Sequence, residues 1–398
     1  MAVVVSHPIQ HFVPFYRALS KVEGLSVTVL YASKIGLQRY FDRDMNTDIE
    51  WSMDLLSGYQ HKFLPEADAI THTSAWSVFN PSIRTELKTL DPEVVLIYGY
   101  AHRTARMALR WCVKTHTPAI MISDSELRAR RVLMKRAVKA LIVPRMLKKF
   151  SAFVTVGDCN EDYYAHYGVS RERMFRSPFT IDEELYRKVR ARRQHLRNTI
   201  RPAWGVADTD LVVLTVGKVN ERKRTGDILD AAALLKSSDP ANRIRFVVAG
   251  DGADLAALKM RAEAEDLPVT FLGFVNVDRL SEIYAACDVL AHPSSRDPHP
   301  LVMSEAACLG LPLVVSSQVG AVGPTDIARQ GENAIVFSVG DTPAMARALK
   351  ELGDNPEHLT YMGRRSIAIF EELDMERSVQ GLLEAATYCV QRSANKFR

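Results

Sequence analysis

The sequence predicts an α/β fold built from two successive parallel-sheet domains, and three observations carry this prediction. Short, β-branched apolar runs alternate with longer amphipathic segments, which is the pattern of strands joined by helices on both faces of a parallel sheet. The alternation occurs twice, in residues 1–176 and again from residue 211. The length of 398 residues suits two domains of about 150 to 200 residues each. We therefore expect two Rossmann-like domains of similar size.

In the first half, a helix is expected at 81–90, because Asn80 is suited to cap it and Pro81 to occupy its first position. A long, basic helical region is expected at 126–150, interrupted near Pro144. The other elements expected in this half are strands at 2–5, 25–31, 62–64, 94–98, 119–122, 152–156 and 173–176, and helices at 12–19, 102–114 and 160–167.

An Arg-rich stretch, 186–201, follows and shows little apolar periodicity, so we predict that it connects the two domains. Beyond it, strands and helices alternate again. The strands are expected at 211–216, 244–249, 270–272, 288–292 and 311–315, and the helices at 225–235, 255–264, 280–286 and from about 301. A last helix, at about 374–391, lies beyond this second set.

The composition is that of an ordinary globular protein, with 47% hydrophobic and 25% charged residues. There is no run of about 18 apolar residues, which argues against a membrane span. Residues 1–5 lack a basic leader and read as a first strand. The five cysteines are scattered, which suits a reducing cytoplasm and argues against a zinc cluster. We expect a cytoplasmic protein.

The charge is unevenly distributed along the chain. Residues 1–200 carry 30 Lys and Arg against 20 Asp and Glu, whereas residues 201–398 carry 21 against 27. The excess is concentrated at 101–150, which holds 13 basic and 2 acidic residues. Such a local excess indicates an anionic partner: a membrane surface, a phosphorylated acceptor or a nucleic acid.

Two acids in the second half, Asp297 and Glu305, are separated by seven residues. Asp297 lies in a Pro-rich loop after an expected strand, and Glu305 lies one turn into the helix that follows. Pro300 and Leu301 stand at the start of that helix, and a helix N-terminus facing such a loop is suited to bind an anion. The segment therefore predicts a site for an anionic ligand.

The segment VGKVNERKRTGD, 216–227, places two lysines between a strand and a helix. Gly217 opens the turn, and Lys218 and Lys223 suit a diphosphate because each is a mobile point charge near a helix N-terminus. The alternative is a pair of surface lysines. Downstream, Gly250 and Gly252 have no side chain, so another group can approach their backbone closely. Either a ligand site or a simple β–α turn would require this.

In their order and spacing, these motifs resemble those of the retaining, GT-B-fold glycosyltransferases of family GT4, also called glycosyltransferase group 1. The resemblance runs over about 211–350 and includes GENAIVF at 331–337. The first acid of the family's E-x7-E motif is Asp297 here, one methylene shorter. The resemblance implies two facing Rossmann-like domains, an acceptor-side domain at 1–195 and a nucleotide-sugar domain at 196–366. It also implies a C-terminal helix, at 367–398, that crosses back to the first domain.

The resemblance further implies roles for single residues. Lys218 and Lys223 would neutralise the leaving diphosphate, Asp297 would hold sugar hydroxyls and Glu305 the ribose. The remaining donor-binding positions would be Gly217, Gly250, Gly252, Phe274, Pro300 and Leu301. Neither metal nor cofactor is expected, and a donor phosphate oxygen would take the acceptor proton. The donor would be a UDP-, GDP- or ADP-sugar.

In the first half, candidate acceptor-side residues follow expected strands, where ligands of open α/β sheets gather. The first loop, SHPIQH, has no Gly but offers His7, Gln10 and His11, which either bind a ligand or remain solvated. His102 and Tyr100 follow a later strand and are suggested to lie near the transferred sugar. Asp124 follows the next strand and is expected at the same edge of the cleft.

The basic tract 128–149 has apolar residues at helical spacing among its cations. The apolar residues are Leu133, Met134, Val138, Leu141 and Ile142, and the cations among them are Arg131, Lys135, Arg136 and Lys139. Such a helix either lies on an anionic membrane surface or packs its apolar face on the sheet and leaves a solvated basic face.

These observations favour a retaining, metal-independent glycosyltransferase that uses a nucleotide-sugar donor and a glycan, lipid-linked or small-molecule acceptor. A nucleotide-sugar epimerase or a phosphorylase on the same fold is one alternative. A basic nucleic-acid- or membrane-binding protein is another, although no aromatic interleaving or nucleic-acid-binding module supports nucleic acid as a partner. A dinucleotide oxidoreductase is disfavoured because no G-x-G-x-x-G follows the first strand.

Overall fold

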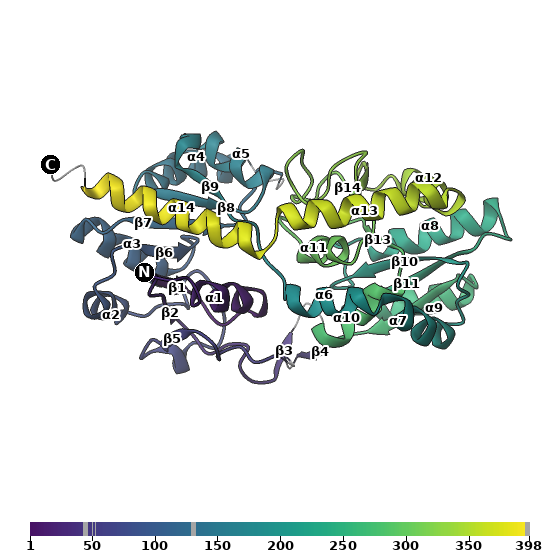
Figure 1. Cartoon of the computed structure of the whole chain (residues 1–398), viewed down its shortest axis with the longest axis horizontal. Coiled ribbons are helices and arrows are strands. Elements are labelled where there is room, and N and C mark those ends of the chain that lie inside the picture. The colour runs from purple at the N-terminus through teal and green to yellow at the C-terminus, as the bar shows by residue number, and fades with distance from the viewer. Residues whose placement is uncertain (43–46, 50, 52, 129–132, 395–398) are drawn as a thin grey trace. The chain divides into compact units, whose positions relative to one another are not determined.

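The computed structural model describes residues 1–42, 47–49, 51, 53–128 and 133–394. The chain divides into two compact units (Figure 1). Unit 1 comprises Met1–Arg39, Met53–Ile181 and Asp374–Arg398, and unit 2 comprises Tyr40–Ser52 and Asp182–Leu373. Each unit is built around its own parallel sheet, so the predicted α/β fold with two Rossmann-like domains is confirmed.

Unit 1 contains a seven-stranded parallel sheet in the order β5-β2-β1-β6-β7-β8-β9. Its strands are β1 (Ala2–Val5), β2 (Thr28–Tyr31), β5 (Gln60–Phe63), β6 (Val95–Tyr98), β7 (Ala119–Ser123), β8 (Ala152–Thr155) and β9 (Met174–Arg176). Its helices are α1 (Val13–Leu19), α2 (Ile83–Leu90), α3 (Arg103–Thr115), α4 (Leu133–Leu147), α5 (Asp158–His166) and α14 (Met375–Ala394). The inner strand β1 is buried along its whole length, as expected for a parallel strand covered on both faces.

The last helix, α14, belongs to unit 1 and packs against β8 and β9. Leu382, Ala385 and Cys389 enter the same core as the residues of β1. At Gly381, a β-carbon would lie 1.9 Å from the carbonyl oxygen of Arg176, so only glycine permits this close approach. The predicted return of a C-terminal helix to the first domain is thereby confirmed.

Unit 2 contains a six-stranded parallel sheet in the order β12-β11-β10-β13-β14-β15. Its strands are β10 (Leu211–Val216), β11 (Ile244–Ala249), β12 (Val269–Gly273), β13 (Val289–His292), β14 (Leu313–Ser316) and β15 (Ala334–Phe337). Its helices are α6 (Glu183–Ala191), α7 (Arg193–Ile200), α8 (Thr225–Ser238), α9 (Leu255–Ala264), α10 (Val277–Ala286), α11 (Leu301–Cys308), α12 (Thr342–Asp354) and α13 (Pro356–Glu372). A short antiparallel pair, β3 (Tyr40–Asp42) and β4 (Thr47–Ile49), groups with this unit.

Both sheets have one point at which the order of the strands reverses. In unit 1 the chain builds outward from β1 through β2 to β5 and then returns to place β6 on the other side of β1. In unit 2 it builds from β10 through β11 to β12 and then places β13 on the other side of β10. The loops at the carboxyl ends of the two strands on either side of such a switch point diverge, and ligands of open α/β sheets bind there.

The Arg-rich stretch at 186–201, predicted as a connection between domains, instead forms helices α6 and α7 of unit 2. The prediction was wrong because the arginines obscured a helical repeat of buried residues: Tyr186, Val189, Leu196 and Ile200. Several of the arginines bind groups within unit 2. Arg193 donates to the carbonyl oxygens of Cys287, at 2.7 Å, and Leu309, at 3.2 Å, which lie at the ends of α10 and α11.

Two boundaries in unit 1 also differ from the predictions. Helix α2 begins at Ile83, because the buried amide of Asn80 donates to the carbonyl oxygen of Ala32, at 2.9 Å, instead of capping the helix. The helical region expected at 126–150 is described from Leu133, and Pro144 lies inside α4 without ending it.

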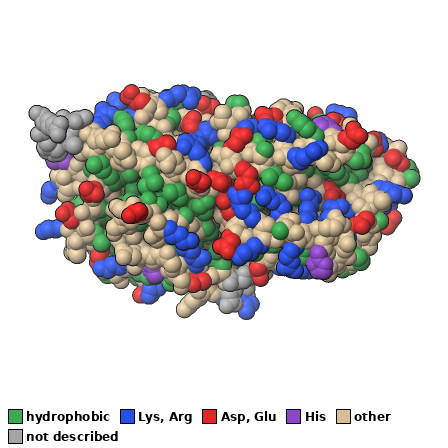
Figure 2. Space-filling model, in the orientation of Figure 1, with side chains coloured by type: hydrophobic (Ala, Val, Ile, Leu, Met, Phe, Trp, Pro, Cys, Tyr) green, Lys and Arg blue, Asp and Glu red, His purple; other side chains and the backbone are tan. Residues whose placement is uncertain are grey.

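On the face seen in Figure 2, Lys and Arg side chains are dispersed among Asp and Glu. None of the helices in the described ranges is long and apolar enough to cross a membrane.

Candidate functional site

Lys223 and Asp297 form an ion pair at the switch point of unit 2. Lys223 comes from the loop after β10 and Asp297 from the loop after β13, 74 residues later in the chain. The ammonium group of Lys223 donates to Oδ2 of Asp297, a residue that is only 8% exposed. His292, the last residue of β13 and 2% exposed, lies with Nε2 at 3.0 Å from the same oxygen. One carboxylate oxygen therefore contacts both the half-buried ammonium group of Lys223 and the buried imidazole of His292.

The protonation of this cluster follows from its surroundings. Burial acts to raise the pKa of Asp297, but the hydrogen bond with His292 and the positive charge of Lys223 outweigh it and hold the pKa well below the usual range. Burial is the main reason that the pKa of His292 is lowered. An ionised carboxylate only accepts hydrogen bonds, so the neutral imidazole of His292 carries its proton on Nε2 and donates it to Asp297.

The loop that carries Asp297 is held by its neighbours on two sides. The backbone N–H of Ser295 donates to the carbonyl oxygen of Arg222 at 2.9 Å, which ties this loop to the one that carries Lys223. The N–H of Gly320 donates to the carbonyl oxygen of Asp297 at 2.7 Å. A β-carbon at Gly320 would lie 1.9 Å from the carbonyl oxygen of Pro298. The position of the carboxylate is thus fixed by backbone contacts.

Glu305, the second acid, lies on α11 and is held by a tyrosine. Tyr284 of α10 is fully buried, and its hydroxyl donates to Oε2 of Glu305 at 2.8 Å. Burial raises the pKa of Glu305, against the opposing effect of this hydrogen bond. A second buried tyrosine, Tyr186, packs edge-on against Tyr284 with ring centroids 6.2 Å apart. Helix α11 begins at Leu301 with Pro300 at its N-cap, where the sequence predicted it.

The glycines predicted to approach the donor also hold neighbouring loops together. A β-carbon at Gly250 would lie 1.8 Å from the carbonyl oxygen of Gly217, and one at Gly252 would lie 2.3 Å from that of Val219. Gly217 itself adopts a φ of +130°, in the region that favours glycine. The loops after β10 and β11 therefore pack backbone against backbone, which brings their N–H groups to the carboxyl edge of the sheet.

Lys218 and Phe274 also lie at this edge. Lys218 is half-buried and directly follows Gly217, and Phe274 is half-buried and directly follows β12. The ring of Phe274 meets that of Trp51 edge-on, with centroids 6.4 Å apart. All the donor-side residues predicted from the sequence thus belong to unit 2, and Lys223 and Asp297 are joined directly. The sequence analysis did not identify His292 or the hydrogen bond of Tyr284.

The acceptor-side candidates lie in unit 1, and two of them flank its switch point. His7 follows β1, and Ser6 Oγ lies 2.8 Å from His7 Nδ1. His102 precedes α3, and its Nδ1 lies 3.1 Å from the carbonyl oxygen of Ser74. The pKa of His7 is lowered to about 4, chiefly by burial and further by the nearby His102. The structure therefore brings these two histidines close enough to interact.

The other acceptor-side candidates differ from one another in what surrounds their side chains. Tyr100 shares a 2.9 Å hydrogen bond with the hydroxyl of Tyr163 and packs against the core. The ring of His11 lies 4.1 Å from that of Phe12, centroid to centroid. Gln10 has a buried Oε1 that accepts no hydrogen bond from any residue in the described ranges. Asp124 is exposed after β7.

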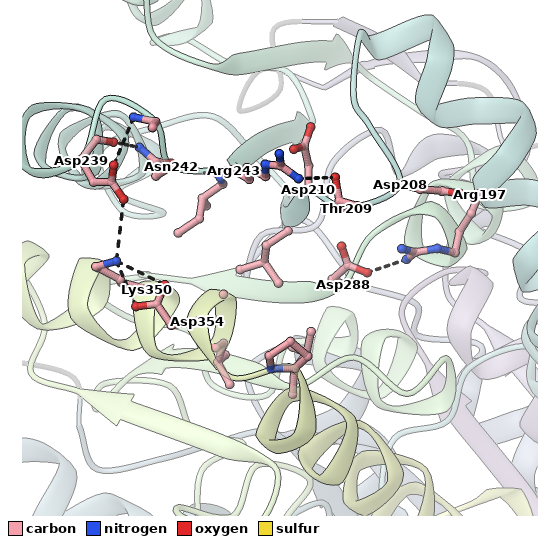
Figure 3. A pocket seen from close by; sticks show the side chains of 17 residues that line it. Arg197, Asp208, Thr209, Asp210, Asp239, Asn242, Arg243, Asp288, Lys350 and Asp354 are labelled. Carbon is pink, nitrogen blue, oxygen red and sulfur yellow. Dashed lines mark hydrogen bonds and ion pairs between the residues drawn. The ribbon is translucent and has the colours of Figure 1, made fainter.

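A cavity of about 420 Å³ lies at the opposite edge of the unit 2 sheet, at the amino ends of β10, β11 and β13 (Figure 3). Two of its cations pair with its acids: Arg197 donates to Asp288 at 2.5 Å, and Lys350 lies 2.9 Å from Asp354. The cavity is therefore separate from the Lys223–Asp297 cluster. Among the described residues, no group of three or more His, Cys, Asp or Glu side chains is arranged to hold a metal ion.

The segment that contains this site is similar to known glycosyltransferases. Residues 197–368 match the family model described as glycosyl transferases group 1. The D-inositol 3-phosphate glycosyltransferase of Rhodococcus opacus is 33% identical over 196 residues, which are 48% of this chain and 43% of that protein. The one from Nocardia farcinica is 30% identical over 226 residues, 55% of this chain and 48% of that protein. The chain therefore spans about half the length of these curated relatives.

Solved structures agree in fold over nearly the whole chain. Anabaena HepE in complex with UDP superposes with a TM-score of 0.72 at 15% identity, covering 96% of this chain and 99% of that one. The glycosyltransferase WaaG superposes with a TM-score of 0.63 at 15% identity, covering 95% and 97%. These similarities confirm the predicted GT-B fold. The segment 197–368, which carries the Lys223–Asp297 cluster, is thus similar to the group 1 glycosyl transferases, and the likeness in fold extends over nearly the whole chain.

Proposed function

We propose that this protein transfers a sugar from a nucleotide-sugar donor to an acceptor, with retention of configuration and without a metal ion. The observation that carries the proposal is the cluster of Lys223, Asp297 and His292 at the switch point of unit 2. It combines a cation suited to a diphosphate with an ionised carboxylate suited to sugar hydroxyls, within the segment that matches the family.

The donor diphosphate would be held by Lys218, Lys223 and the N-terminus of α11. In the free protein, the ammonium group of Lys223 is bound to Asp297. Donor phosphates would compete for that ammonium group, which frees Oδ2 of Asp297 to accept a hydroxyl of the transferred sugar. His292 would continue to donate to the carboxylate and keep it ionised. Glu305 would bind the ribose hydroxyls.

During transfer, Lys218 and Lys223 would stabilise the negative charge that develops on the leaving diphosphate. The acceptor proton would pass to a donor phosphate oxygen, so no side chain is assigned as general base. We assign the acceptor to unit 1, where His7 and His102 flank the switch point. Solved structures of HepE with UDP and with UDP-glucose support a nucleotide-sugar as donor, and relatives named D-inositol 3-phosphate glycosyltransferases support glycosyl transfer.

The proposal is tested by incubating the full-length protein with UDP-, GDP- and ADP-sugars and a panel of acceptors. We expect one nucleotide series to raise the unfolding temperature, because a ligand that binds the native state stabilises it. With that donor, a new glycoside should form whose anomeric configuration matches the donor, and an excess of EDTA should leave the rate unchanged. An epimerised donor sugar, or a product that requires inorganic phosphate, would identify one of the alternative enzymes.

Glu305→Gln is expected to raise the donor KM by about 10- to 150-fold, which corresponds to about 1.5 to 3 kcal/mol for hydrogen bonds to a charged group. Steady-state kinetics with varied donor measure the change. Glu263→Gln, at an exposed position of α9, is the matched control and should keep the wild-type KM. A wild-type donor KM in Glu305→Gln would rule out the ribose assignment.

The pH dependence of stability separates this role from a structural one. The folded-state pKa of Glu305 is raised, so its ionisation opposes folding, and the cost grows as the pH rises above the unfolded value of about 4.3. Gln cannot ionise and still accepts the hydrogen bond from Tyr284. Glu305→Gln should therefore be at least as stable as the wild type at pH 7, with the difference shrinking toward pH 4.

For the localisation, we propose peripheral attachment of unit 1 to an anionic membrane surface through α4. Of the predicted basic tract, Arg131 lies outside the described residues, as do the side chains at 133–138. The supporting observation is the pair Leu141 and Ile142, which are 61% and 54% exposed on α4. Exposed Lys148 and Lys149 directly follow the end of α4. Apolar side chains next to cations suit the interface of an anionic bilayer.

We expect the wild type to float with vesicles containing phosphatidylglycerol and the variant Lys148→Glu/Lys149→Glu to be released at moderate salt. Each cation near such a surface contributes about 1 kcal/mol, so two reversals change the balance by several times that amount. Lys236→Glu/Lys259→Glu in unit 2 is the matched control. A wild-type protein that never floats excludes the membrane proposal.

A further inference from the structure

A second cavity, of about 440 Å³, lies on unit 1 between helices α2 and α3. The two helices pack against each other and lie side by side in Figure 1. The cavity is lined by Arg84, Thr85, Lys88, Arg110, Trp111, Lys114 and Thr115. Its volume falls within the range of sites that hold small molecules, roughly 300 to 1,000 Å³. The glycosyl-transfer proposal makes no use of it.

The lining carries four cations and no acid. Arg84 and Lys88 are four residues apart on α2, and Arg110 and Lys114 are four residues apart on α3, so each pair lies on one face of its helix. Within the described part of the chain, none of the four forms an ion pair with a carboxylate. The cavity of Figure 3 differs, because its Lys350 and Arg197 are paired with acids.

Like charges four residues apart on a helix repel each other, so this arrangement is unfavourable until an anion enters. The supporting elements are rigid. Leu87 and Cys112, on the inner faces of the same helices, are buried in the core of unit 1. Trp111 packs against that core, and the hydroxyl of Thr115 donates to its carbonyl oxygen at 2.9 Å. The four cations are exposed, and they project from fixed backbones into a shared space that is open to solvent.

The chemistry of the lining specifies the anion. The planar guanidinium groups of Arg84 and Arg110 match two oxygens of a phosphate at once, and the ammonium groups of Lys88 and Lys114 add point charges. The hydroxyl of Thr85 adds a donor of hydrogen bonds. The indole of Trp111 supplies an apolar wall, which suits the face of a sugar ring and is not needed by a free inorganic ion.

We propose that the α2–α3 cavity binds a phosphate group carried on a sugar. Arg110 lies eight residues beyond His102, so the cavity begins about 12 Å along α3 from that acceptor-side candidate, toward the amino edge of the sheet. It is therefore a separate binding site, and binding there does not depend on the proposed transfer activity.

Binding is tested by calorimetric titration of inorganic phosphate and of glucose 6-phosphate at constant ionic strength. The full-length protein carries Lys223→Ala, so that phosphate binding at the unit 2 site is weakened. Adding Arg84→Gln/Arg110→Gln should raise the Kd of both ligands at least tenfold. Adding the exposed pair Lys21→Gln/Lys259→Gln removes the same charge elsewhere and should change the Kd less than twofold. Equal unfolding temperatures of the two variants verify that both are folded.

Three results would overturn the proposal. The first is the absence of saturable phosphate binding in the Lys223→Ala protein. The second is an equal Kd for inorganic phosphate and glucose 6-phosphate, which would leave an ion site without a sugar. The third is binding of duplex DNA or phosphatidylglycerol vesicles that depends on Arg84 and Arg110 while glucose 6-phosphate does not bind. These titrations need no transfer activity, so a failed transfer assay leaves their outcome unaffected.

Discussion

Replacing Lys223 by Ala is expected to lower kcat for sugar transfer by about 10²- to 10³-fold, the usual effect of removing one group that stabilises developing charge. Lys223 is the cation that the structure places at the switch point, on the same oxygen of Asp297 that His292 contacts. Without it, the charge on the leaving diphosphate is less compensated. Steady-state kinetics at saturating donor measure the loss.

The matched control is Lys236→Ala, which breaks an exposed ion pair with Asp266 of 2.8 Å. Exposed pairs contribute about 0 to 1 kcal/mol to stability, so this variant should keep wild-type kcat and nearly wild-type unfolding temperature. Lys223→Ala should also remain folded, because its side chain serves the site and not the apolar core. Wild-type kcat in Lys223→Ala would remove Lys223 from the catalytic site.

Asp297→Asn is expected to lower kcat/KM by at least about 10²-fold, or roughly 3 kcal/mol of transition-state stabilisation. Asn keeps the size of the side chain and removes the charge that orients His292 and Lys223. Asp297→Glu, which restores the acid of the family motif, keeps the charge and should retain more activity than Asn. Kinetics of both variants with the same donor decide whether charge or shape matters, and an active Asp297→Asn would refute the assignment.

Stability gives an independent check on the same residue. The folded-state pKa of Asp297 is depressed, so its contribution to folding is present above the unfolded value of about 3.9 and is lost as the pH falls through the folded value. Asp297→Asn should thus be less stable than the wild type at pH 7, and the difference should narrow in acid. A constant difference across this range would mean that the ion cluster does not stabilise the fold.

Much of unit 2 could be predicted from the sequence, because its local patterns and its fold agree. Strands 211–216 and 244–249 and helix 255–264 have the predicted bounds. The ion pair of Lys223 with Asp297 could not be predicted by proximity, since 74 residues separate them and only the strand order brings them together. His292 was missed because a single polar residue at the end of an apolar strand has no distinctive spacing. Its place at the carboxyl end of a predicted strand was the one sign that it could belong to the site.

The composition of 186–201 suggested a solvated connection because of its arginines, and the structure shows two packed helices instead. Arg201 is 1% exposed and donates to Asp288 at 2.6 Å and to the carbonyl oxygen of Ala286 at 2.8 Å. Whether a cation faces water or a carbonyl depends on which helix end lies opposite, and that is a tertiary property. The same holds for the cavity between α2 and α3, whose four cations are spread over 31 residues of sequence.

The place of α14 in unit 1 has a consequence for the order of events during synthesis. Its residues Leu382 and Ala385 complete a core whose strands end at Arg176. About 200 residues must be translated between that strand and this helix, which takes roughly 10 to 40 seconds at 5 to 20 residues per second. Over that interval α1 packs on this face of the nascent sheet, but the part beside β8 and β9 lacks the helix that covers it. We therefore expect unit 2 to fold first and chaperones to engage the emerging N-terminal part of the chain.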